Sequence, residues 1–206
     1  MITSNIGKIF LDAYNEKYGT SYDARTFFLE QFYPLFFDQN KYMMTAGNSP
    51  LENPKLSWDD MIKGKKPFET PVQRKSRFEK LIKKIEETEA DASIARGYAS
   101  LDVAATTSGQ VTDMKLPNSQ EEIYTSWIGD ALGIGVQGGF SILFSNKEIL
   151  LDIFEGWKLY RTSLNETTML KGNQINTWNG QWLSHYYDTR EYDAEMPLAG
   201  FSPYNT

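Results

Sequence analysis

Apolar residues near the start of the chain recur with the period of an amphipathic helix. Five of them share one helical face: Ile6, Ile9, Phe10, Ala13 and Tyr14. Spacings of three and four residues bring side chains onto one stripe, so the pattern predicts a helix over residues 4–18. Thr3 or Ser4 can cap its start, and Gly19 stands where a left-handed residue would end it.

A second predicted helix, over residues 23–33, has a broad aromatic face. The apolar run comprises Phe27, Phe28, Phe32 and Tyr33, followed by Leu35, Phe36 and Phe37. Pro34 has no backbone N–H and its ring crowds the preceding turn, so we expect the helix to kink or stop there. We interpret this dense aromatic run as a core element rather than as a membrane or partner surface.

A third helix is predicted from residue 71 to at least residue 88. Thr70 suits the N-cap and Pro71 suits the first helical position. The apolar residues of its inner face are Phe78, Leu81, Ile82 and Ile85. We expect this face to be buried.

The C-terminal part mixes helical and strand-like patterns. Residues 120–132 predict a helix capped by Asn118 or Ser119. The glycine-rich segment 133–139, which we expect to be a turn between elements, precedes a short apolar run, 139–144, that we expect to be a buried strand. Ser145 and Glu148 then have the spacing of a capping box and open a helical pattern, for which a strand is the alternative.

These elements predict an α+β fold that is predominantly helical, with a helical N-terminal half and a mixed C-terminal half containing a small sheet. The helical region with the third helix spans residues 1–98, and an aromatic-rich α/β region spans residues 118–206. The weakly patterned segment 99–117 is expected to be a loop or boundary. A single domain comprising both regions is the alternative.

Composition supports a folded protein in a reducing environment. The 206 residues are 40% hydrophobic and 14% aromatic, which is enough to build a packed core. The absence of cysteine excludes disulfides and thiolate metal sites and favours a cytoplasmic setting. No secretory signal or membrane-spanning stretch is visible, so we expect no membrane partner. The last residues carry no stop signal, and the chain could be part of a longer protein.

Basic residues are concentrated between Lys63 and Lys84. This window holds nine of the 21 Lys and Arg residues but only two acids, so its formal charge is +7 (nine minus two) in a chain of net charge −6. The predicted helix within it has bases first and acids later. That order is unfavourable to the helix dipole, and it destabilises the helix by roughly a few tenths of a kcal/mol per exposed charge. Because helix stability does not explain the arrangement, we expect a partner.

The window predicts phosphate binding, since each Lys or Arg that neutralises a phosphate releases counterions. We therefore expect a non-catalytic nucleic-acid-associated protein that is a subunit of a larger nucleoprotein or protein assembly. The predicted contacts are Lys65, Lys66, Arg74, Lys75, Arg77, Lys80, Lys83 and Lys84. The acidic whole chain leaves an alternative open, a structural module whose basic helix docks on an acidic protein, as a homo- or hetero-oligomer.

A catalytic alternative is a Mg²⁺-dependent nuclease of the restriction-enzyme type, with Asp152, Glu155 and Lys158 as candidate residues. Such a site needs two carboxylates to hold the ion and a lysine near the attacking water. The usual core has one residue between Glu and Lys on a strand, whereas two residues separate Glu155 from Lys158. On a helix this spacing gives an ordinary ion pair.

Two further patterns carry little weight. Gly133, Gly135 and Gly138 match the dinucleotide-binding fingerprint, but a helical segment precedes them where a strand is required. His185 is the only histidine in the sequence, which leaves no multi-histidine zinc site and no basis for a catalytic triad. We therefore expect no metal and no cofactor.

Overall fold

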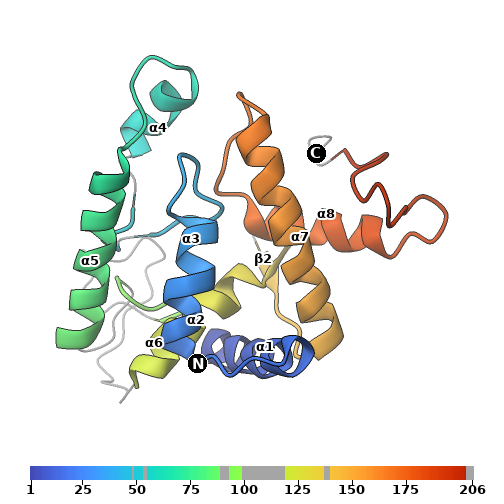
Figure 1. Ribbon diagram of the computed structural model, residues 1–206, viewed down its shortest axis with the longest axis horizontal. Coiled ribbons are helices and arrows are strands. Elements are labelled where there is room, and N and C mark those ends of the chain that lie inside the picture. Colours follow the sequence, from blue (N-terminus) through green and yellow to red (C-terminus); the bar gives the residue numbers. More distant parts are fainter. Residues whose placement is uncertain (48, 53–54, 89–92, 99–118, 137–139, 203–206) are drawn as a thin grey trace.

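The computed structural model describes residues 1–47, 49–52, 55–88, 93–98, 119–136 and 140–202, without the side chains of 55–58. It is mostly helical and has a small two-stranded antiparallel sheet in the C-terminal half, which confirms the predicted fold class. The segment 99–117, expected to be a loop or boundary, lies outside the described residues. Figure 1 shows helix α5 at one end of the molecule and helix α8 with the C-terminal segment at the other.

Helix α1 (Ile2–Tyr18) ends as predicted. Gly19 has φ 62°, and its N–H donates to the Asn15 carbonyl oxygen. The expected cap is wrong, because the helix begins earlier and both candidate cap residues lie inside it. Their buried hydroxyls donate to backbone carbonyls of other segments, from Thr3 to Arg96 at 2.8 Å and from Ser4 to Glu122 at 2.9 Å.

The second helix passes through Pro34 instead of stopping. It comprises α2 (Ala24–Phe27), the wider π-helical segment η1 (Phe28–Phe32) and α3 (Tyr33–Phe36). The Tyr33 N–H donates to the Phe28 carbonyl oxygen, five residues back rather than four. This wider turn directly precedes Pro34 and relieves the crowding that made us expect a break.

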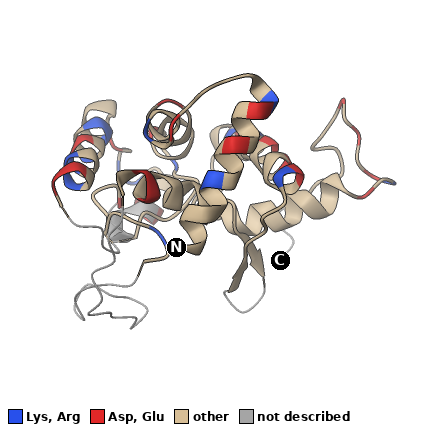
Figure 2. Ribbon diagram, turned by 90° about the horizontal axis from the view of Figure 1, so that it is seen from below, with Lys and Arg blue, Asp and Glu red and all other residues tan. Residues whose placement is uncertain are grey.

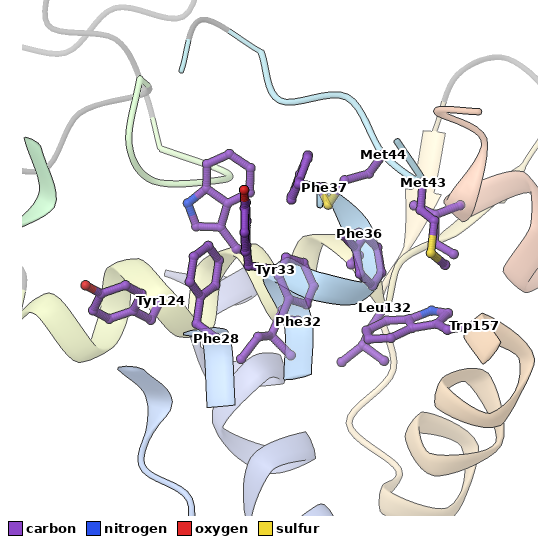
Figure 3. Close-up of a cluster of buried hydrophobic side chains, with 14 of the residues drawn as sticks. Phe28, Phe32, Tyr33, Phe36, Phe37, Met43, Met44, Tyr124, Leu132 and Trp157 are labelled. Atoms are coloured by element: carbon purple, nitrogen blue, oxygen red, sulfur yellow. The ribbon is translucent and has the colours of Figure 1, made fainter. Parts of the chain in front are cut away.

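Aromatic side chains of this helix form the centre of the core, which confirms their interpretation as core residues (Figure 3). The ring of Phe32 stacks on Phe28 and on Phe36, with centroids 5.3 and 4.2 Å apart. Phe36 meets the indole of Trp157 edge-on at 4.8 Å. The buried apolar cluster includes residues from both predicted regions, so the N-terminal and C-terminal halves share this core.

Helix α6 (Gln120–Ala131) lies against α1 with no side chain between the backbones at two points. Ser119 caps α6 as predicted, in a capping box with Glu122. A Cβ atom on Gly7 would overlap the Thr125 carbonyl oxygen, and one on Gly129 would overlap the Thr3 carbonyl oxygen. Only glycine allows this separation between the two helices.

Helix α4 (Lys55–Ile62) leads into α5 (Pro71–Glu87), which forms as predicted. Thr70 is its N-cap, in a reciprocal capping box with Gln73. Leu81 and Ile85 are buried, while Phe78 and Ile82 are half-buried. The ring of Phe78 stacks on Tyr33, with centroids 3.7 Å apart, and so fastens α5 to the aromatic helix.

The sheet is a hairpin of β1 (Ile134–Val136) and β2 (Phe140–Ile142), in which Gly135 pairs with Ser141. Two expectations are corrected here. All three residues of β2 are exposed, although we expected a buried strand, because no described layer covers its outer face. The glycine-rich segment is not simply a turn, because its first part forms β1.

Helix α7 (Lys147–Glu166) follows the hairpin, and α8 (Ile175–Tyr186) follows α7. Asn146, not Ser145, caps α7, since its side-chain oxygen accepts from the N–H groups of Glu148 and Ile149 at 2.9 and 3.1 Å.

The sequence pattern did not predict α8. Its apolar positions are few, and tertiary packing against α7 and β1 stabilises it.

We predict that Gly129→Ala destabilises the protein. Alanine favours a helix interior by about 1 kcal/mol over glycine, but the new methyl group would force α6 away from α1. Overpacking of this kind costs about 1–3 kcal/mol or more. We expect a net loss of at least ~1 kcal/mol in urea unfolding, whereas Ser76→Ala on the exposed face of α5 should change stability by less than ~0.5 kcal/mol. A Gly129→Ala protein as stable as the wild type would contradict the close crossing.

Candidate functional site

The two arginines of α5 contact acidic and carbonyl groups in the two segments that precede and follow α4. Arg74 is 9% exposed, and its Nε lies 3.0 Å from Asp38 Oδ1. It also donates to the Glu69 carbonyl oxygen at 2.6 Å. Arg77 Nη2 lies 2.6 Å from the Glu69 carboxylate, and Nη1 donates to the Glu52 carbonyl oxygen. These contacts fasten the segments on either side of α4 to the basic helix.

The lysines of the basic window lie outside this network and are mostly exposed. Pairs of 3.6–3.9 Å join Lys66 to Asp60, Lys75 to Glu79 and Lys83 to Glu87. Lys84 donates to the Ser93 hydroxyl, while Lys65 and Lys80 point to solvent. Figure 2 accordingly shows both signs of charge along α5.

Tertiary contacts reduce the local charge of this region. Helix α5 carries six basic and three acidic residues, and Asp38 and Glu69 approach its arginines from outside the helix. Arg25 also approaches Glu86 from outside the helix, so six minus three minus two plus one leaves +2. For Arg74 and Arg77 the contacts that the structure shows are within the chain, and the partner that we expected stays a prediction. The prediction that the eight residues contact phosphates is not tested by these contacts.

The nuclease candidates Asp152, Glu155 and Lys158 all lie on α7, not on adjacent strands. Lys158 pairs with Glu155 at 2.9 Å across one helical turn, and Lys158 is exposed whereas Glu155 is half-buried. Burial would raise the pKa of Glu155, but hydrogen bonds from Tyr18 and Lys158 outweigh it and hold that pKa below its ordinary value. Asp152 accepts from the Tyr187 hydroxyl at 2.6 Å. This is the arrangement expected of ordinary surface pairs.

The remaining sequence patterns have structural roles. Gly133 and Gly135 lie at the base of an antiparallel hairpin, without the helix that a dinucleotide fingerprint requires, and Gly138 lies outside the described residues. A Cβ atom on Gly135 would lie 3.1 Å from the backbone of Asn176. His185 is buried, with its Nε2 3.0 Å from the Pro197 carbonyl oxygen.

An open cavity lies between the hairpin and α8 and has a volume of about 1010 Å³. Its apolar wall includes Val136 and Phe140, which are 40% and 72% exposed. Its polar wall belongs to α8 and the segment before it. The polar side chains on that wall are Asn173, Gln174, Asn176, Thr177, Gln181 and Ser184. We call this cavity the hairpin groove.

None of the described residues that line the hairpin groove carries a charge. The two segments that build it explain why, since residues 131–146 and 172–187 contain no Lys, Arg, Asp or Glu. Figure 2 shows the strands of the hairpin in tan, the colour of uncharged residues, projecting from the body. We missed this site in the sequence because we searched for concentrated charge. The signal that could have found it was two long uncharged segments in a chain that is 23% charged.

Two asparagines of α8 hold the groove in place. The Asn176 amide nitrogen donates to the carbonyl oxygens of Asp130 and Gly133 at 3.0 and 2.9 Å. The Asn179 amide nitrogen donates to those of Ala131 and Gly133 at 2.8 and 2.9 Å. The Asp130 and Ala131 carbonyls lie in the last turn of α6, and the Gly133 carbonyl lies directly before β1. The base of the hairpin is therefore fixed to α8.

Comparisons with protein-family models, with curated proteins and with solved structures gave no match for this chain. Within the described part of the chain, no cluster of three or more His, Cys, Asp or Glu side chains is arranged to hold a metal ion. None of the helices described is long and apolar enough to span a membrane. The case for function therefore rests on the geometry of the exposed surfaces.

We predict that Arg74→Ala destabilises the fold by about 1–2 kcal/mol, because it removes a buried side chain together with its hydrogen bonds to the Glu69 carbonyl oxygen and to the exposed Asp38 carboxylate. Lys80→Ala, on the exposed face of the same helix, should change stability by less than ~0.5 kcal/mol. Urea unfolding followed by circular dichroism measures both. Equal effects of the two substitutions would show that Arg74 does not anchor the segments that contain Asp38 and Glu69.

Proposed function

We propose that the protein is a non-catalytic interaction protein, a component of a larger assembly, that binds an extended uncharged polypeptide segment in the hairpin groove. The observation that carries this proposal is the exposed, charge-free surface formed by the hairpin and α8. Solvent-exposed apolar surface rimmed by polar residues is typical of interaction sites. The absence of cysteine supports a cytoplasmic setting for this assembly.

The composition of the groove favours a peptide over an ionic ligand. The side-chain amides of Gln174 and Gln181 offer both donors and acceptors, as a peptide backbone does. The exposed ring of Phe140 offers apolar surface for a side chain of the partner. A phosphate or carboxylate would find no lysine or arginine among the lining residues. The volume is at the upper end of the range for ligand sites, about 300–1,000 Å³.

We predict that a charge placed on the polar wall weakens peptide binding. Peptides selected from a random displayed library on the purified protein should be rich in uncharged residues, and their affinity can be measured by fluorescence anisotropy. Thr177→Arg should raise the dissociation constant at least about tenfold, which is about 1.4 kcal/mol, because an unpaired charge would have to be desolvated.

Met196→Lys is the matched control, since Met196 is 61% exposed and does not line the groove. It should change the dissociation constant by less than about twofold, as expected for a charge outside the site. The proposal fails if selection yields only charged peptides, or if Thr177→Arg binds the selected peptides as tightly as the wild type. A selection that recovers sugars but not peptides from mixed libraries would assign the groove to glycans instead.

Phosphate contact by the exposed lysines is the second candidate function, and the exposure of Lys65, Lys75, Lys80 and Lys83 supports it. Their ion pairs, where present, are 3.9 Å long and solvent-exposed, and such pairs contribute little. Arg74 and Arg77 have intramolecular partners, so we propose that the lysines, rather than the arginines, would make the contacts.

We predict that reversing Lys75, Lys80 and Lys83 to Glu abolishes any salt-dependent binding of RNA or DNA oligonucleotides. Each lost phosphate contact should also reduce the slope of log affinity against log salt by about one unit. Lys147→Glu, on the distant helix α7, is the control and should leave both values unchanged. Wild-type protein that binds no oligonucleotide at low salt would end this candidate function.

A further inference from the structure

Strand β2 has an open edge. In the described residues, the sheet consists of β1 and β2 alone, so β2 pairs on one side only. Its other side therefore presents a row of backbone N–H and C=O groups without sheet partners. The hairpin projects from the body of the molecule, and no other described strand pairs with this row (Figure 2).

The edge also lacks the features that usually prevent strand pairing. Soluble proteins protect edge strands with charged residues, prolines or bulges. The segment 131–146 contains no Lys, Arg, Asp, Glu or Pro. Phe140, Ile142 and Phe144 are 72%, 44% and 37% exposed, so the unprotected edge is also apolar.

The open backbone edge favours a polypeptide partner over a lipid surface. In hydrocarbon, the unpaired N–H and C=O groups of a sheet edge would find no hydrogen-bond partner. A strand from another chain would satisfy them. It would also extend a two-stranded sheet, which is marginally stable in isolation, to a size that supports itself.

We propose that β2 pairs with β2 of a second copy of this chain, antiparallel about a two-fold axis at Ser141. This inference rests on the proposed function, because it takes the hairpin to be an interaction surface. The register places Phe140 opposite Ile142 of the second copy. Both residues lie on the same face of β2, since side chains alternate, so the pairing joins two apolar faces into one.

The charge-free hairpin avoids the repulsion that otherwise opposes association of two copies. Each chain carries a net charge of −6, so most surfaces of two copies repel one another. The hairpin is a long segment without acidic residues, and it can meet its own copy without placing like charges side by side. The resulting four-stranded sheet, in the order β1-β2-β2-β1, uses the same patch on both copies, as a two-fold dimer requires.

Sedimentation velocity over a range of protein concentrations tests the proposal. The wild type should show a reversible monomer–dimer equilibrium. Phe140→Lys and Ile142→Glu should each raise the dimer dissociation constant at least about tenfold, because each places two unpaired charges in the homodimer. Circular dichroism spectra and melting temperatures like those of the wild type would show that both exposed substitutions leave the fold intact.

Mixing the two variants provides the decisive measurement. In the mixed dimer, Lys at position 140 of one copy faces Glu at position 142 of the other, while the native Phe140–Ile142 pair remains at the other end. The mixture should therefore associate at least about fivefold more tightly than either variant alone. Thr177→Arg, which lies in the groove but not on the β2 edge, should leave the dimer unchanged.

Three results would overturn the inference: a wild type that stays monomeric at all concentrations, a dimer that Phe140→Lys leaves unchanged, or a mixture that associates no better than its components. The proposed function has a separate test, because peptide binding responds to Thr177→Arg. A monomeric wild type that still loses its selected peptides on Thr177→Arg overturns self-pairing alone.

Discussion

The arrangement of the C-terminal half depends on the buried amide of Asn179. Its side chain is completely buried, its nitrogen donates to the end of α6 and the base of the hairpin, and its oxygen accepts from the Trp157 indole at 3.1 Å. An unpaired amide in the core would cost about 1–3 kcal/mol. Helices α6 and α7 and the base of the hairpin are therefore held in one position relative to α8. The hairpin leaves the body in a fixed direction for this reason.

Tryptophan indoles extend this network along α7. The N–H groups of Trp178 and Trp182 on α8 donate to the Gly156 and Asp152 carbonyl oxygens at 2.9 and 2.8 Å. Trp182 approaches so closely that any Cβ on Gly156 would overlap its ring. Helix α8 is thus fixed to α7 on one side and to the hairpin on the other. The polar wall of the hairpin groove is rigid for this reason.

The basic helix and the hairpin groove lie in different parts of the molecule and differ in their chemistry. On α5, Asp38 and Glu69 pair with the two arginines, so part of the concentrated charge contributes to the fold. In the groove, uncharged segments meet and leave apolar and amide groups exposed. An assembly component that uses the groove for a polypeptide and the lysines for phosphate would need no overlap between the two surfaces.

The amino-acid sequence alone determined the elements whose signals are local. The periodic apolar residues and caps of α1, α5 and α6 involve neighbours within a few positions, so the helix pattern and Thr70, Ser119 and Gly19 were predictable. Only the tertiary structure decided the rest. Arg74 meets Asp38 across 36 positions and Asn179 meets Ala131 across 48, and no local pattern encodes such contacts. The groove likewise exists because two uncharged segments, unremarkable when read separately, are brought face to face by those long-range hydrogen bonds.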